Sequence, residues 1–153
     1  MPYEIEVETL APQKAYAIRA TVPAGQISEK VAALLPEVFQ FILTNGSGVA
    51  GMPFTRYLRT GGDEVEIEAG IPVVKGTPVS GPIQLIELHG GPTAVMLHIG
   101  THEELPQAHA ALRTWVRQRG KSAVEASWEE YVTGPGDETD PQKWETRVCQ
   151  PIL

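Results

Sequence analysis

The sequence Trp128-Glu129-Glu130-Tyr131-Val132-Thr133-Gly134-Pro135-Gly136-Asp137 is typical of a short strand that runs into a Pro/Gly turn. Side chains on a strand alternate between its two faces, so we expect Glu129 and Tyr131 on one face and Trp128 on the other. A carboxylate beside a phenol suits a pocket for a cationic or polar aromatic small molecule, or acid–base chemistry. The alternative is a half-exposed strand at the margin of a sheet.

Residues 54–64 form a second copy of this stretch. Without a gap, Phe54 aligns with Trp128, Thr55 with Glu129 and Tyr57 with Tyr131. The similarity extends in both directions: residues 65–68 align with 144–147 after a short insertion, residues 71–72 with 150–151, and residues 16–21 with 94–99. Such an internal repeat predicts a duplicated strand–helix–strand–strand unit.

The duplication predicts a single domain over residues 1–153 that contains two modules, about residues 14–74 and 93–151. We expect the modules to be related by a pseudo-two-fold axis, with a ligand groove where they meet. The position of Glu129 in the second copy is Thr55 in the first. One carboxylate therefore breaks the symmetry, which is typical of a binding site on a symmetric scaffold.

Hydrophobic periodicity predicts an α+β fold with two main helices, at about residues 26–44 and 103–119, and a largely antiparallel sheet of about eight strands. Pro36 is expected to kink or break the first helix, and Asn45-Gly46 to end it. Thr101-x-x-Glu104 matches a capping box at the start of the second helix. Residues 83–89 and 93–100 flank Gly90-Gly91-Pro92 and are expected to form a hairpin that joins the two copies.

Composition narrows the class of protein. The chain has 153 residues, 42% of them apolar, a net charge of −7 and no apolar run of transmembrane length. The absence of a Lys/Arg cluster argues against direct binding to nucleic acid. A single cysteine, Cys149, cannot form an internal disulfide, and no signal peptide is visible, so we expect a cytoplasmic protein that is not bound to a membrane.

Several other residues are candidates for the same site. Met96 and His98 share one strand face, which would line the groove if the aliphatic face of Val95, Leu97 and Ile99 met the helix. His98 has a second interpretation as a hydrogen-bonded structural histidine. Glu68 either enters the site or belongs to a solvated acidic face with Glu64 and Glu66. His98, His102 and His109 do not have metal-ligand spacing, so we expect neither a metal nor a cofactor.

Five pieces of the sequence resemble one known family. They are Phe54-Thr55-Arg56-Tyr57, Glu68-Ala69-Gly70-Ile71-Pro72-Val73, Gly90-Gly91-Pro92-Thr93-Ala94, His98-Ile99-Gly100 and Trp128-Glu129-Glu130-Tyr131 with its following turn. In this order, over essentially the whole chain, they are similar to the GyrI-like domain, also called the bacterial effector-binding domain of AraC-type and MerR-type multidrug regulators.

The resemblance implies two β-α-β-β modules and a groove in which a glutamate recognises lipophilic, often cationic molecules among aromatic side chains. Glu129 best matches that glutamate, with Tyr131 beside it. Together with the candidates from strand faces and the repeat, the predicted ligand-binding set is Glu129, Tyr131, Tyr57, Glu68, Met96, His98, Phe54, Trp128 and His102. Where relatives carry Pro-Tyr ahead of the second helix, this chain has Thr101-His102, which replaces an aromatic wall by a titratable imidazole. No helix-turn-helix is expected upstream, unlike in relatives that act as transcription factors.

The candidate site residues and the family resemblance together suggest three functions. The first is a stand-alone module that binds lipophilic or cationic, drug-like molecules, as multidrug-binding relatives do. The second is a hydrolase of electrophilic cyclopropane-type natural products, with Glu129 and Tyr131 as the catalytic residues. The third is an inhibitor that binds a topoisomerase as its protein partner, although the chain has no concentrated acidic tail.

Overall fold

The computed structural model describes residues 3–60, 62–133 and 137–153. It divides into two compact units, which are described separately. The α1 unit is Pro12–Leu88, and the α2 unit is Met1–Ala11 together with His89–Leu153. The turns expected at residues 61–63 and 134–140 fall partly on Gly61 and residues 134–136, which lie outside the described residues.

The α1 unit contains four antiparallel strands and one long helix. Its elements are β2 (Gln13–Pro23), the 3-10 turn η1 (Ala24–Gln26), α1 (Ile27–Asn45), β3 (Phe54–Arg59), β4 (Glu64–Pro72) and β5 (Ile83–Leu88). The strands pair in the order β5-β2-β4-β3. The apolar stripe of α1, formed by Val31, Leu34, Val38 and Ile42, packs on Tyr16, Ile18, Ala69 and Ile71 of the sheet.

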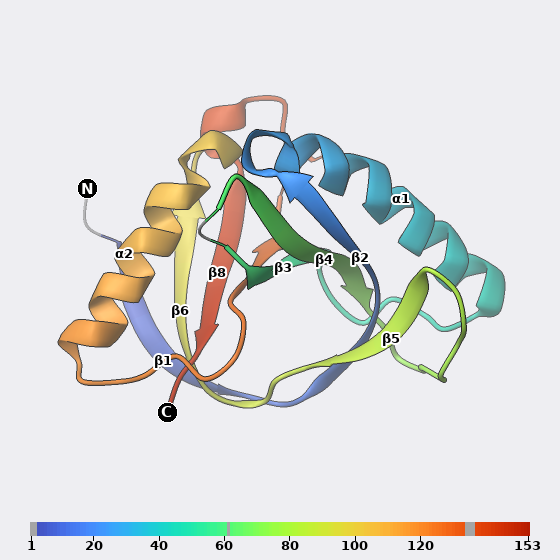
Figure 1. Ribbon diagram of the computed structural model, residues 1–153, viewed down its shortest axis with the longest axis horizontal. Helices are drawn as coiled ribbons and strands as arrows, with labels where there is room; N and C mark the ends of the chain where they lie inside the picture. The colour runs from blue at the N-terminus through green and yellow to red at the C-terminus, as the bar shows by residue number, and fades with distance from the viewer. Residues whose placement is uncertain (1–2, 61, 134–136) are drawn as a thin grey trace. The chain divides into compact units, whose positions relative to one another are not determined.

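The α2 unit repeats this arrangement. Its elements are β1 (Ile5–Leu10), β6 (Gly91–Ile99), the 3-10 turn η2 (His102–Glu104), α2 (Leu105–Gln118), β7 (Trp128–Tyr131), η3 (Pro141–Lys143) and β8 (Glu145–Pro151). The strands pair in the order β1-β6-β8-β7, and α2 lies along this sheet in Figure 1. Leu105, Ala108, Leu112 and Val116 of α2 pack on Ala94, Met96 and Val148.

Strand register confirms the duplication residue by residue. Phe54 lies opposite Gly70 and Trp128 opposite Cys149, at equivalent positions of the two units. The aligned pair Arg56 and Glu68 likewise matches the pair Glu130 and Arg147. The α+β class, the eight strands and the two main helices of the described residues are as the sequence predicts.

Three local expectations need correction. β5 pairs with β2, whereas β6 pairs with β1 and β8, so the segment around residue 90 connects the units without forming a hairpin. α1 continues through Pro36 as one helix of 19 residues, so the proline does not break it, and the helix ends as expected at Gly46, whose φ is 72°. Thr101 does not cap the second helix through a backbone bond, because its hydroxyl donates to Glu104 Oε1 at 3.1 Å instead.

None of the helices in the described part of the chain is long and apolar enough to cross a membrane.

Candidate ligand-binding site

Glu129 and Tyr131 lie on the same face of β7, as strand alternation predicts. The Tyr131 hydroxyl donates to Glu129 Oε2 at 2.7 Å, whereas Trp128 Nε1 on the opposite face donates to Glu130 Oε2 at 3.1 Å. The Glu129 residue is only 3% exposed. Its face of the sheet is the one that α2 covers, since Glu129 is opposite Val148 in register and Val148 belongs to the core beneath α2.

His109 of α2 provides a second partner for this carboxylate. Its Nε2 lies 2.8 Å from Glu129 Oε1, and its side chain is 11% exposed. A phenol thus contacts one oxygen of Glu129 and an imidazole the other. A buried carboxylate requires such hydrogen bonds, because desolvation without them is costly.

The contact between His109 and Glu129 was not predicted from the sequence, where His109 was one of three histidines without metal-ligand spacing. A signal was present, because Leu105, His109, Leu112 and Val116 follow the i, i+4, i+7, i+11 spacing of one helix stripe. A polar residue on an apolar stripe is buried unless the helix is frayed, so it needs a polar partner from another element.

His102 and Trp144 extend the site around Tyr131. The ring centroid of His102 lies 5.5 Å from that of Tyr131 and 4.8 Å from that of Trp144. Burial lowers the pKa of His102, and nearby His98 lowers it further, while the charge of Glu129 acts in the opposite direction. Since the net shift is downward from 6.5, the imidazole is neutral at pH 7. Its Nε2 is buried and has no hydrogen-bond partner among the described residues.

The expectation for Met96 and His98 is wrong about which strand face meets the helix. Met96 is 1% exposed and packs beneath α2, whereas Leu97 and Ile99 on the other face are 44% and 61% exposed. Met96 is therefore a core residue. His98 is also buried, with Nε2 3.1 Å from the Thr101 carbonyl and Nδ1 3.2 Å from the Tyr3 hydroxyl. These contacts match the alternative interpretation of His98 as a structural histidine.

The structure does not bring Trp128 into contact with the Glu129 carboxylate. Trp128 is 2% exposed and lies on the opposite face of β7, where it is the register partner of Cys149. Burial and the nearby Glu130 raise the pKa of the Cys149 thiol to about 12, although Arg147 acts in the opposite direction. Cys149 is therefore an unreactive core thiol.

The remaining candidates, Phe54, Tyr57 and Glu68, belong to the α1 unit. Phe54 is fully buried over Gly70, and Tyr57 is half-buried on β3. Glu68 is not part of a solvated face, because it is only 3% exposed. Its Oε1 accepts a hydrogen bond of 2.9 Å from Arg56 Nε, and its Oε2 accepts one of 3.1 Å from Arg19. Two guanidinium groups thus compensate its charge.

Solved structures with this fold include a regulator and a ligand complex. The EcmrR C-terminal domain matches with a TM-score of 0.88 and 21% identity over 100% of this chain and 99% of that one. EcmrR in its DNA complex matches with a TM-score of 0.86 and 20% identity over 98% of this chain, which spans 57% of the EcmrR chain. SAV2435 bound to tetraphenylphosphonium gives a TM-score of 0.65 and 15% identity, with coverage of 98% and 94%.

A structure described as a hydrolase from Listeria innocua also matches, with a TM-score of 0.67 and 13% identity over 99% of this chain and 93% of that one. At these identities, the likeness shows the fold alone. No curated protein sequence matches the chain. The family model for the GyrI-like small molecule binding domain matches residues 3–153, which is nearly the full length. The chain therefore belongs to the GyrI-like family of small molecule binding domains.

Proposed function

We propose that the protein binds lipophilic cations and that the Glu129 carboxylate is the anionic anchor. Binding of small molecules is the property that names the family, and the class of ligand and the role of Glu129 are the proposal. One observation carries it: Glu129 is 3% exposed, and it accepts a hydrogen bond of 2.7 Å from Tyr131, whose ring lies 5.5 Å from that of His102.

The electrostatics favour a cation over a neutral ligand. A carboxylate removed from water loses hydration, and a cation that approaches it in a low-dielectric environment restores favourable interaction energy. Glu68 is the weaker candidate, since Arg56 and Arg19 already compensate its charge. Glu129 is the candidate anchor because it lies next to the aromatic rings around Tyr131.

Aromatic rings next to the carboxylate supply the lipophilic part of the site. Tyr131, His102 and Trp144 lie in a row with ring centroids 5.5 and 4.8 Å apart. Rings of this kind attract cations through their electron-rich faces. The neutral state of His102 adds to this, because an imidazolium would repel a cationic ligand. The tetraphenylphosphonium bound by SAV2435, a protein of the same fold, belongs to this ligand class.

Calorimetric titration with two ions of the same shape and opposite charge tests the proposal. We expect tetraphenylphosphonium to bind the wild type more tightly than tetraphenylborate, and Glu129→Gln to weaken binding of the cation at least about tenfold, equivalent to about 1.4 kcal/mol. Glu130→Gln is the matched control, because it removes the same charge one residue away on the opposite face. Equal cation affinity in Glu129→Gln and wild type would contradict the role of Glu129, and tighter binding of tetraphenylborate would contradict the ligand class.

Hydrolysis of an electrophilic small molecule is the second candidate, favoured by the hydrogen bond between His109 Nε2 and Glu129 Oε1. A water oxygen would bond to an electrophilic ring carbon, the strained bond to that carbon would break, and its electron pair would take up a proton. The His109–Glu129 pair would accept the proton released by water and pass it to that electron pair, so the pair ends as it began and the net reaction is the addition of water across the broken bond.

Binding and turnover are distinguished by the fate of the ligand. A binder stabilises the protein in proportion to the logarithm of ligand concentration and releases the ligand unchanged. If an activated cyclopropane or ester compound gives product with wild type and with Glu130→Gln, and no product with folded Glu129→Gln and His109→Gln, the hydrolase is supported. Product formation that persists in both of the last two variants would exclude this pair as the catalytic groups.

A further inference from the structure

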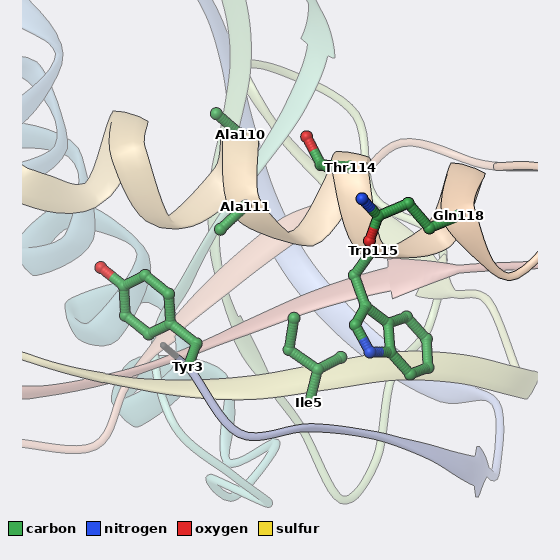
Figure 2. Close-up of a pocket in the computed structure, with 7 residues that line it drawn as sticks. All are labelled: Tyr3, Ile5, Ala110, Ala111, Thr114, Trp115 and Gln118. Atoms are coloured by element: carbon green, nitrogen blue, oxygen red, sulfur yellow. The ribbon is translucent and has the colours of Figure 1, made fainter. Parts of the chain in front are cut away.

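A groove of about 390 Å³ lies between β1 and α2, within the α2 unit. In Figure 2, Tyr3 and Ile5 lie below the helix, Trp115 extends down from the helix beside them, and the other lining side chains of the helix are small or polar. The complete lining is Tyr3, Ile5, Ala110, Ala111, Thr114, Trp115 and Gln118. The lining is mostly apolar and has an aromatic ring at each end, which is typical of a site for a small aromatic molecule.

The side chains that line the groove leave apolar surface exposed. Tyr3, Ile5 and Trp115 pack against the core beneath α2 but are only partly buried, and alanines occupy positions 110 and 111 of the helix. A ligand in the groove would cover these exposed parts.

The groove is separate from the Glu129 site. The strand order β1-β6-β8-β7 places β1 and β7 at opposite edges of the four-stranded sheet, with α2 packed on β6 and β8 between them. His109 contacts Glu129 on β7, whereas Ala111 and Trp115 line the groove beside β1. The two sites therefore lie on opposite flanks of one helix.

The helix side of the groove is basic at the end formed by Trp115, whereas at the other end burial and the charge of Glu104 raise the pKa of Tyr3. The net charge of the chain is −7, yet no acidic residue occurs between Glu104 and Glu125. Four basic residues lie in this interval: Arg113, Arg117, Arg119 and Lys121. Arg119 stands over the Trp115 ring, with its guanidinium carbon 4.8 Å from the ring centroid. Within the described part of the chain, none of the four forms an ion pair, so their charge is uncompensated locally.

We propose that the groove between β1 and α2 is a second binding site that takes a flat aromatic anion. The aromatic body lies against Trp115 and Tyr3, and its anionic group faces Arg119 at the C-terminal end of α2. The ligand class is thus opposite in charge to the one proposed for Glu129. The two proposals stand independently, because they rest on different residues and different edges of the sheet.

The probe is 1-anilinonaphthalene-8-sulfonate, a fluorescent aromatic anion. We expect saturable binding of one molecule per chain, with quenching of Trp115 fluorescence. Thr114→Trp, which fills the groove from an exposed helix position, should weaken binding at least about tenfold, or 1.4 kcal/mol. Glu129→Gln should bind the probe as the wild type does. Unsaturable binding, an unchanged affinity in Thr114→Trp, or loss of binding in Glu129→Gln would each overturn the proposal.

A second arm tests the charge. N-phenyl-1-naphthylamine has the same aromatic body without the sulfonate. Arg119→Gln should weaken binding of the sulfonate probe several-fold and leave binding of the neutral amine unchanged. Arg59→Gln, which removes an equally exposed arginine from the α1 unit, is the matched control and should affect neither probe. Equal effects of Arg119→Gln and Arg59→Gln on the sulfonate probe would show that only net charge matters and would overturn the assignment of Arg119.

Discussion

The two units have the same strand order and register but treat equivalent positions differently. Opposite Phe54 at the start of β3, the α1 unit has Gly70, and opposite Trp128 at the start of β7, the α2 unit has Cys149. Two residues further on, the ion pair is reversed: Arg56 faces Glu68 in one unit, and Glu130 faces Arg147 in the other. The duplicated backbone thus conserves the pairing of opposite charges and not their placement.

The difference extends to the groups that can do chemistry. The α1 unit compensates its buried carboxylate, Glu68, with two arginines. The α2 unit holds Glu129 with a phenol and an imidazole, and it contains all four histidines of the chain. Imidazole side chains are therefore confined to one copy. This difference is the reason for placing the proposed ligand site in the α2 unit.

The largest expected effect comes from placing the α2-unit residue in the α1 unit. A Cβ on Gly70 would lie 2.6 Å from the Tyr16 carbonyl oxygen, 2.8 Å from Ala17 Cβ and 2.8 Å from Phe54 Cζ. Two of these atoms are backbone or Cβ and cannot rotate away, so we expect Gly70→Cys to lower the free energy of unfolding by about 3 kcal/mol in urea titration. Gly25→Ala is the control, since nothing lies within 4 Å of its Cβ. A Gly70→Cys variant as stable as wild type would mean that the units tolerate the same side chain there.

The second prediction compares the reversed ion pairs. Glu68 is 4% exposed at its side chain and Arg56 15%, so Glu68→Gln leaves a largely buried arginine without its counter-charge. We expect a loss of about 2–3 kcal/mol. Glu130 and Arg147 are 22% and 32% exposed, and their closest atoms are 3.3 Å apart without hydrogen-bond geometry. We therefore expect Glu130→Gln to cost less than about 1 kcal/mol in the same urea titration. Equal losses would mean that burial does not distinguish the pairs.

Much of the fold could be predicted from the sequence because the spacing of apolar residues and the glycines and prolines that end helices and strands are local properties of the chain. The alignment of Phe54 with Trp128 predicts the observed register, and Gly46 ends α1 as expected. Which face of a strand is covered is not a local property. Met96 and Leu97 are equally apolar in the sequence, and only packing against α2 buries the first and exposes the second.

In the candidate site too, contacts within one element could be predicted from the sequence, and contacts between elements could not. Glu129 and Tyr131 are two residues apart on one strand, so alternation alone places them together. His109 is 20 residues from Glu129, and their contact depends on which side of α2 faces β7. The arginines of Glu68 come from two other strands, so sequence alone left open whether that carboxylate was solvated or compensated.

The smallest expected effect tests whether acid sensitivity is confined to the α2 unit. The pKa of His102 is lowered from 6.5, chiefly by burial, so the unfolded chain binds this proton more readily than the folded one. Stability from this group is complete above about pH 6.5 and is lost as pH falls through the lowered pKa. His102→Phe retains a ring against Tyr131 and Trp144 and removes the titration. Its free energy of unfolding should therefore fall less than that of wild type between pH 7.5 and 5, as measured in urea, with His89→Gln as the control histidine variant.

Hydrogen exchange should locate the acid-dependent opening in the α2 unit, because the α1 unit contains no histidine. The same pH dependence in His102→Phe and wild type, or opening confined to the α1 unit, would show that another group carries the acid sensitivity.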